Sequence, residues 1–209
     1  MELHSQNSVA ILTFPCGAGY PRLTRSVLNE LAELLVTVQR EGLFDGIVIA
    51  ANTESFPTGA DIEELAALDG IGARQFAQTG QALFDQIERF SLPVVAAIRG
   101  FCLGGGLDLA LACHARVAAY DSSFGHPGGS LGLLTGWGGT QRLPRLVGKA
   151  QALQILLTGE RIPATQALTL GLVDELVASD DLVEAAARHA RQLAAAGQGT
   201  TVHLLGIKR

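Results

Sequence analysis

Charge is scarce in this chain of 209 residues, and positive charge is scarcer than negative charge. Only 17% of the residues are charged, and 15 Lys and Arg against 20 Asp and Glu give a formal net charge of -5. A general nucleic-acid binder presents a strongly basic surface, which this balance does not provide. The composition therefore argues against a nucleic-acid partner and leaves a small molecule that carries phosphate open.

Long apolar runs are missing as well. The best candidate is interrupted by Asp108, His114 and Arg116, so it falls short of the about 18 apolar residues that a membrane-spanning helix needs. Residues 1–7 lack the cationic start and the apolar centre of a secretory signal. We therefore expect a cytoplasmic protein without a membrane partner.

Cysteine is also rare. Cys16, Cys102 and Cys113 are odd in number, lie far apart and form no C-x-x-C pair. This pattern gives little support for a disulfide framework or a zinc site. We expect buried or idle thiols and no bound metal.

Apolar residues make up 48% of the chain, enough for one well-buried core. Apolar steps of three and four from Leu23 to Val38 predict a helix that ends around Gly42. A second helix is predicted through Phe76 and Ile87, and the strands and helices alternate as in a parallel α/β fold. The predicted strands cover 9–14, 46–51, 94–98 and 116–120, the further helices 107–112, 149–157 and 182–195, and a short strand or extended link 171–177.

Glycine is abundant, with 25 residues, many of them between Gly100 and Gly139. Two loops, 56–61 and 99–106, each follow a predicted strand and precede a predicted helix, so both present backbone N–H groups where a helix dipole favours negative charge. Within the first loop, Asp61 and Glu64 have the spacing of an N-cap and its reciprocal partner. Taken singly, each loop is also explained as a glycine-rich turn that caps a helix.

Taken together, these segments resemble the crotonase family of enoyl-CoA hydratases and isomerases. The resemblance covers about residues 8–195 in order, and its most distinctive parts are a glycine triplet and a G-G-T-Q-R-L run. It implies a spiral of ββα turns, that is, an α/β crotonase-like superhelix, which binds an acyl-CoA thioester. The motifs that carry it are G-A-D-I at 59–62, P-V-V-A-A-I-R-G-F-C-L-G-G-G-L-D-L-A at 93–110, G-G-T-Q-R-L at 138–143 and L-T-G at 157–159.

The resemblance also implies a set of site residues. The backbone N–H groups of Ala60 and Gly105 would polarise the thioester carbonyl, and Asp108 would be the first candidate for proton transfer. No metal or redox cofactor is implied, because CoA enters as part of the substrate. Substrate contacts are expected from Thr58, Gly59, Asp61, Ile62, Gly104, His126 and Gly128.

Two departures from the family pattern concern the proton-transfer groups. Family hydratases use two glutamates to hold a water, and here Asp108 matches the first. The second would lie in 124–128, where the family commonly has F-G-Q-P-E, but this chain ends that run with Gly128. Asp108 is either a general acid or base or a charge that complements the helix dipole. His126 is either a proton relay or a hydrogen-bonded loop residue, and Ser130 or Asp121 are further substitutes that no spacing selects.

Two further departures concern the ends of the resemblance. The loop after the opening strand lacks the R-P and N-A-L that the family commonly has there. Arg22 or Arg25 could then contact a phosphate, or both could be ordinary exposed surface arginines. The family commonly continues for roughly fifty more residues as a helical segment that helps build a trimer. We therefore expect a crotonase-like acyl-CoA-binding core over 1–196, a short tail over 197–209, and a homotrimer or dimer of trimers with a shortened C-terminal helical segment.

Two rival interpretations remain. Residues 128–132 fit the G-x-S-x-G elbow of serine hydrolases around Ser130, with Asp174 or Asp180 and His189 or His203 downstream, although the flanking residues are poor as a strand and a helix. A crotonase-fold protein that binds acyl-CoA with little or no turnover would explain Gly128 without a replacement base.

Overall fold

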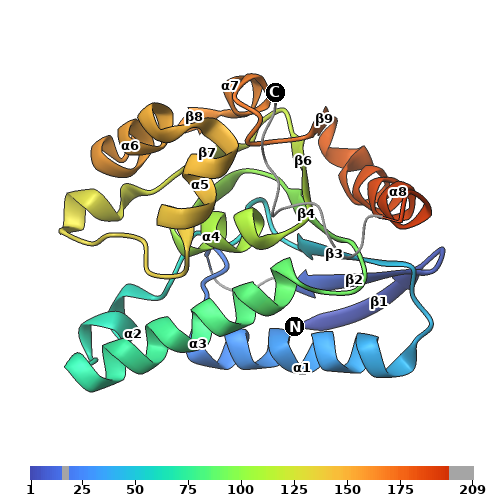
Figure 1. The fold of residues 1–209 in the computed structure, drawn as a ribbon, viewed down its shortest axis with the longest axis horizontal. Coiled ribbons are helices and arrows are strands. Elements are labelled where there is room, and N and C mark those ends of the chain that lie inside the picture. Colours follow the sequence, from blue (N-terminus) through green and yellow to red (C-terminus); the bar gives the residue numbers. More distant parts are fainter. Residues whose placement is uncertain (16–18, 198–209) are drawn as a thin grey trace.

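The computed structural model describes residues 1–15 and 19–197. Its main sheet has six strands in the order β1-β2-β3-β4-β6-β9 (Figure 1). The first two strands pair antiparallel, and every later pair in this sheet is parallel. The strands are β1 (Glu2–Gln6), β2 (Val9–Phe14), β3 (Gly46–Ala51), β4 (Val94–Ile98), β6 (Ala115–Ala119) and β9 (Glu175–Val177). The parallel α/β arrangement predicted from the sequence is thereby confirmed.

A second, smaller sheet has the order β5-β7-β8. It consists of β5 (Phe101–Leu103), β7 (Ser123–Gly125) and β8 (Ile162–Pro163). The β5–β7 pair is parallel and aligns Leu103 with Gly125, so the chain that leaves β5 and the chain that leaves β7 emerge side by side. This sheet therefore brings two loops from distant parts of the sequence to one place.

Helices cover both faces of the main sheet. Leu28, Leu31 and Leu35 of α1 (Arg25–Glu41) pack with Phe84 and Ile87 of α3 (Gly70–Glu88) on one face, where the two helices run side by side in Figure 1. On the other face lies α8 (Leu182–Ala195), whose alanines contact the alternate side chains of the same strands. The remaining helices are α2 (Ile62–Ala66), α4 (Gly105–Ala112), α5 (Gly139–Val147), α6 (Lys149–Thr158), α7 (Ala164–Thr169) and the short 3-10 helices η1 (Pro127–Leu131) and η2 (Ser179–Asp181).

The ends of α1 show how closely local signals set a boundary. Gly42 adopts φ 64° and terminates the helix, as predicted. The N-cap is Thr24, whose side chain accepts a hydrogen bond from the Val27 N–H, so the helix begins two residues after Leu23, where the apolar stripe starts. Leu23 instead forms a parallel bridge with Ala60, and its N–H donates to Gly59 O at 2.9 Å. That bridge ties the start of α1 to the first glycine loop.

The predicted cysteine environment is confirmed where it can be compared. Cys102 and Cys113 are buried free thiols, and burial raises the pKa of Cys113 to about 12. Cys16 lies outside the described residues. Over 1–15 and 19–197 no cluster of His, Cys, Asp or Glu is arranged to hold a metal ion, and no helix there is long and apolar enough to cross a membrane.

Candidate active site

The two glycine loops meet beside the N-terminus of α4. A methyl group placed on Gly59 would lie 3.3 Å from the Gly105 nitrogen, and one placed on Gly105 would lie 3.5 Å from the Ala60 nitrogen. Gly59 has φ 115° and Gly104 has φ 52°, both in the region that favours glycine. Gly105 is the first residue of α4, so its N–H has no acceptor within the helix. The Ala60 and Gly105 amides, 45 positions apart in the chain, therefore lie next to each other.

Close approach explains the rest of the glycine triplet. A methyl group on Gly106 would overlap the Pro57 carbonyl oxygen at 1.7 Å, and one on Gly105 would overlap the Trp137 ring at 2.4 Å. The two loops and the indole are thus packed so tightly that side chains at these positions would separate them. Glycine is required here by packing as well as by backbone conformation.

The capping of α2 was predicted in part. Asp61 is its N-cap, and the carboxylate accepts the Glu64 N–H at 2.9 Å. The reciprocal bond expected from Glu64 is wrong, because its carboxylate accepts the Arg25 N–H instead, at 3.1 and 3.3 Å. Asp61 also pairs with Arg22 at 3.0 Å. The loop is therefore held to the start of α1 by charged groups.

A cavity of about 460 Å³ opens in front of the two amides. Asp61 is absent from its lining, which agrees with the capping role of that side chain. The other predicted site residues all line it: Thr58, Gly59, Ala60, Ile62, Gly104, Gly105, Asp108, His126 and Gly128. Much of the remaining wall was not indicated by any sequence motif. It comes from Leu65, Leu68, Ala73, Phe76, Ala77, Pro127, Ser130, Leu131, Leu133, Leu134, Thr135, Gly136, Trp137 and Leu156.

Asp108 is the carboxylate of this cavity. It projects from the first turn of α4 with 1% of its surface exposed. One oxygen, Oδ2, accepts hydrogen bonds from the Thr135 hydroxyl and from the Trp137 N–H. Burial raises the pKa of Asp108 to about 6, although these two bonds, the Arg142 charge and the nearby Gly139 backbone N–H act in the opposite direction. Asp108 therefore faces the cavity and also lies at a helix start, so both sequence interpretations describe its position.

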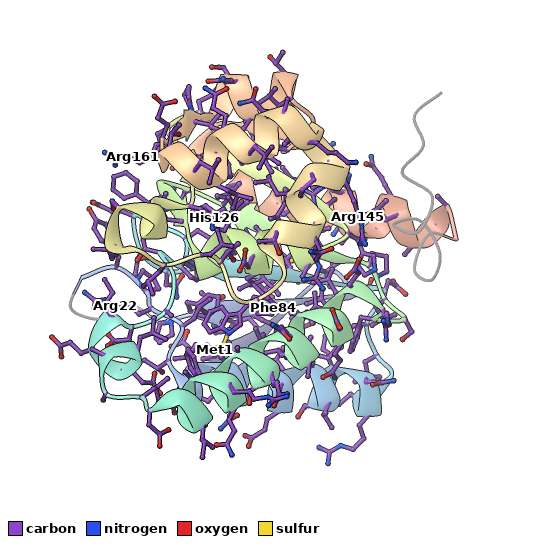
Figure 2. All side chains as sticks on the ribbon, turned by 60° about the vertical axis from the view of Figure 1, so that its left-hand side comes forward. Met1, Arg22, Phe84, His126, Arg145 and Arg161 are labelled. Carbon is purple, nitrogen blue, oxygen red and sulfur yellow. The ribbon has the colours of Figure 1, made fainter. Side chains whose placement is uncertain are left out.

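His126 faces the second oxygen of Asp108. Its Nε2 lies 3.5 Å from Asp108 Oδ1, and neither atom has a hydrogen-bond partner among the described residues. Only 4% of the histidine is exposed, and Figure 2 shows it in the interior, whereas Arg22 and Arg161 lie at the edge. Burial lowers the pKa of His126 to about 4, which keeps the imidazole neutral near pH 7. If His126 were only a hydrogen-bonded loop residue, its Nε2 would be expected to have a partner, and it has none among the described residues.

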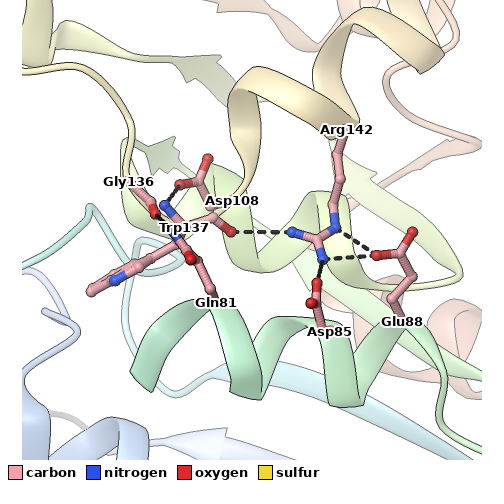
Figure 3. A network of polar contacts seen from close by, with 7 residues as sticks. All are labelled: Gln81, Asp85, Glu88, Asp108, Gly136, Trp137 and Arg142. Carbon is pink, nitrogen blue, oxygen red and sulfur yellow. Dashed lines mark hydrogen bonds and ion pairs between the residues drawn. The ribbon is translucent and has the colours of Figure 1, made fainter. Parts of the chain in front are cut away.

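A buried arginine holds the loop that carries Trp137 (Figure 3). Arg142 of α5 donates to the Trp137 carbonyl at 3.1 Å and to Asp85 and Glu88 of α3 at 2.6 and 2.7 Å. Gln81 of α3 donates to the Gly136 carbonyl at 2.7 Å in the same network. These bonds fix the Trp137 N–H on Asp108 and its indole against Gly105.

The comparisons with known proteins agree with this geometry. The sequence model described as enoyl-CoA hydratase/isomerase matches residues 4–205. The chain belongs to the enoyl-CoA hydratase/isomerase family. Its structure matches an enoyl-CoA hydratase from Bacillus anthracis with a TM-score of 0.87 and 32% identity, over 92% of this chain and 76% of that one. It matches DspI from Pseudomonas aeruginosa with the same TM-score and identity, over 92% and 74%. The predicted crotonase fold is thereby confirmed.

Longer proteins of this family are also similar. The fatty acid oxidation complex subunit alpha of Shewanella sp. (strain MR-4) is 43% identical over 200 residues, which are 93% of this chain and 28% of that protein. The same subunit from Shewanella frigidimarina is 44% identical over 191 residues, 89% and 27% respectively. The chain thus spans less than a third of the length of these curated relatives.

Within this family fold, the remaining predicted groups are placed as follows. Gly128 lines the cavity and has no side chain to offer, and Asp121 is exposed in the turn after β6. Ser130 lies inside η1, where its hydroxyl donates to the Pro127 carbonyl at 2.7 Å. The strand-turn-helix of a nucleophile elbow is therefore not formed at Ser130. His203 and the tail from 198 onward lie outside the described residues.

Proposed function

We propose that this protein is an enzyme of the hydratase/isomerase type that acts on an acyl-CoA thioester and stabilises an enolate. The observation that carries the proposal is the convergence of the Ala60 and Gly105 amides on one cavity that also holds the buried carboxylate of Asp108. The thioester oxygen would accept one hydrogen bond from each of the two N–H groups. The Asp108 carboxylate would transfer the proton.

The energetics of such a site favour the transition state over the substrate. Proton removal beside a thioester, or addition across its conjugated double bond, places negative charge on the carbonyl oxygen. Fixed backbone donors aimed at that oxygen strengthen their hydrogen bonds as the charge develops. Each donor contributes about 3 kcal/mol in comparable oxyanion sites.

Asp108 has the properties of a general base at neutral pH. With a pKa of about 6 the side chain is mostly ionised at pH 7, yet it is basic enough to accept a proton from a weak acid. Its Oδ2 accepts hydrogen bonds from Thr135 and Trp137, which hold the carboxylate in the wall of the cavity. This fixed position and the raised pKa support the proposed role.

The apolar part of the cavity would hold the acyl chain. Leu65, Leu68 and Phe76 come from α2, α3 and the turn between them, and Leu133 and Leu134 come from the loop after η1. A hydrocarbon chain gains about 0.8 kcal/mol for each methylene it buries. The apolar wall therefore supports an acyl substrate better than a polar one.

Absorbance spectroscopy tests the reaction class. We expect the protein to change the conjugation of at least one of crotonyl-CoA, a 3-enoyl-CoA and a dienoyl-CoA. If no substrate changes while saturated acyl-CoA binds by calorimetry, the protein is a binding protein without turnover, the alternative that Gly128 favours. If acyl-CoA neither reacts nor binds, the proposal is wrong altogether.

We also propose that the chain assembles as a homotrimer or dimer of trimers. Exposed leucines on α6 and at η1, which lie against each other, support an apolar interface: Leu131, Leu153 and Leu157 are 59%, 56% and 71% exposed. Such a cluster is typical of a surface that another chain covers. Light scattering that finds a monomer at micromolar concentration would rule the assembly out.

A further inference from the structure

One end of the cavity is closed by a single indole. Trp137 lines the cavity with 4% of its surface exposed, and a methyl group on Gly80 of α3 would come within 2.3 Å of its indole nitrogen. The same ring lies against Gly105, the first residue of α4. Phe76 and Phe84 of α3 contact it at centroid separations of 5.2 and 5.6 Å. An acyl chain that begins at the two amides therefore cannot pass between α3 and α4 at this point.

The indole is fixed in this place by its own bonds and by those of its backbone. The ring N–H donates to the Phe76 carbonyl at 3.4 Å. The Trp137 backbone N–H donates to Asp108 at 3.2 Å, and the Trp137 carbonyl accepts from Arg142 at 3.1 Å. Because ring and backbone are both bonded, the ring cannot move aside without losing these contacts. The closed end therefore does not open for a longer chain.

The other end of the cavity reaches the surface. Along one side of α3, Gly80 is buried, Ala77 is partly buried and Ala73 is exposed, at the spacings of three and four that share a helix face. Ala77 and Ala73 line the cavity together with Leu133 and Leu134, which are 47% and 63% exposed. In Figure 1 the yellow loop between η1 and α5 lies at the same end of the molecule as α2 and the start of α3. We call Ala73, Leu133 and Leu134 the rim.

The cavity also changes in polarity between its two ends. Among the described residues that line it, the ionisable side chains are Asp108 and His126. Both lie at the closed end, because Asp108 accepts the Trp137 N–H and His126 is 3.5 Å from Asp108. The path toward the rim is lined by aliphatic side chains, Leu68 among them. The open end thus suits a hydrocarbon, whereas Arg22, exposed beside the first glycine loop, favours that side for the charged CoA part.

Resting on the proposed function, we propose that this site takes long-chain acyl thioesters, whose acyl group runs from the two amides outward along α3. Ala77 and Ala73 are the specificity-determining residues, because their small side chains leave the path open. From Gly80 to Ala73 this path follows seven residues of α3, about 10 Å at 1.5 Å per residue, which is about the length of an eight-carbon chain. The carbons of a longer chain would leave the cavity and cover Leu133 and Leu134 at the rim.

Calorimetry with saturated acyl-CoAs tests the proposal without any turnover. Butyryl-, octanoyl- and lauroyl-CoA are titrated into the protein at concentrations below those at which lauroyl-CoA forms micelles. Inside the cavity we expect affinity to rise about four-fold, or about 0.8 kcal/mol, for each methylene. On the half-covered rim we expect about two-fold for each methylene, so lauroyl-CoA should bind about 16-fold more tightly than octanoyl-CoA.

Two pairs of variants locate the acyl chain. Ala77→Phe should lower the affinity for lauroyl-CoA at least about ten-fold more than the affinity for butyryl-CoA, because the ring narrows the path. Its matched control is Ala82→Phe, on an exposed position of α3 outside the cavity lining, which should keep the wild-type series. If Ala77→Phe does not fold, Leu134→Ser at the exposed rim should reduce the 16-fold gain to about four-fold or less. Leu43→Ser, an equally exposed leucine after α1, should leave that gain unchanged.

The outcomes separate this proposal from the proposed function. Equal affinities for octanoyl- and lauroyl-CoA would overturn it, since they would show that the chain does not reach the rim. An Ala77→Phe variant that weakens every chain length equally, or a Leu134→Ser variant that keeps the full gain, would overturn it as well. In each of these cases acyl-CoA still binds and the proposed function stands. If no acyl-CoA of any length binds or reacts, the proposed function itself is rejected.

Discussion

The two faces of the main sheet are formed by the same strands but bury different kinds of side chain. Toward α8, the strands present Val9, Val48 and Val95, which pack with alanines of α8 in one buried apolar layer. Toward α1, α3 and α4, the same strands present larger apolar residues, but this side also encloses Asp108, His126 and Arg142. Because side chains alternate along a strand, one sequence run builds both layers.

The two faces differ in whether they bury ionisable groups that lower the stability of the fold. A buried carboxylate and a buried imidazole both cost stability, and both lie where the cavity can use them. The α8 face contains no such group among its buried residues and can contribute stability alone. We therefore expect changes on the cavity face to alter rates most, and changes on the α8 face to alter the free energy of unfolding.

The largest effect should come from Asp108→Asn. The amide cannot accept the proton, so we expect kcat to fall by about 1000-fold in whichever thioester reaction the wild type performs. Asp121→Asn is the matched control, because Asp121 is exposed and outside the cavity lining. Steady-state kinetics with both variants measures the contrast, and an Asp108→Asn rate close to that of the wild type would refute the role given to this carboxylate.

The same substitution should make the protein more stable at neutral pH. The folded state binds the Asp108 proton more tightly than the unfolded chain, because the pKa rises from 3.8 to about 6. The wild type therefore loses up to about 3 kcal/mol as pH rises from 4 through 6, and the asparagine variant does not. The pKa of His126 is lowered instead, so this group costs stability as pH falls below 6.5, equally in both proteins.

Urea unfolding at several pH values checks this expectation. The stability difference between variant and wild type should grow between pH 4 and 6 and level off above pH 7. A difference that stays constant with pH, or that shrinks as pH rises, would contradict the burial effect on Asp108.

Two glycine-to-alanine changes compare the faces directly. In Gly105→Ala the new methyl group meets the Trp137 ring at 2.4 Å, so the amide must move and we expect a rate loss of about 10-fold to 100-fold. In Gly46→Ala the new methyl group meets the Ala190 methyl of α8 at 2.9 Å, and we expect a loss of about 1–2 kcal/mol in stability with kcat unchanged. Kinetics and urea unfolding of both variants measure the two effects. A rate loss in Gly46→Ala together with an unchanged rate in Gly105→Ala would contradict the comparison.

The smallest effect should come from Thr135→Val. The hydroxyl donates to Asp108 Oδ2 and lowers the pKa of that carboxyl, so its removal should raise the pKa further. We expect the midpoint of the pH-rate profile to move up by roughly half a unit to one unit. A midpoint that stays in place or moves down would show that Thr135 does not tune this group.

Much of this molecule follows from local sequence. The apolar runs of β3 and β4 and the spaced leucines of α1 carry their own periodicity, so their positions were predicted within a few residues. Both glycine loops were expected beside helix starts, and the structure brings them together. Polar β1 was missed because Glu2, His4 and Gln6 give no apolar signal.

The remainder depends on tertiary contacts. β5, β7 and β8 have two or three residues each, too few to show a period, and α5 begins with glycine and contains Pro144. The approach of His126 to Asp108 arises from strand pairing between these short segments, which the spacing along the chain does not reveal. Thr135 lies just before the G-G-T-Q-R-L motif at 138–143, but nothing in that motif indicates its bond to Asp108.

The central claim is that the Ala60 and Gly105 amides bind one thioester oxygen. Difference infrared spectroscopy of a saturated acyl-CoA, labelled with carbon-13 at its carbonyl, measures this without any turnover. We predict that the carbonyl stretch of the bound thioester shifts to lower wavenumber than in solution, and that Gly105→Ala reduces the shift. A bound thioester whose carbonyl stretch matches that of free acyl-CoA would contradict it.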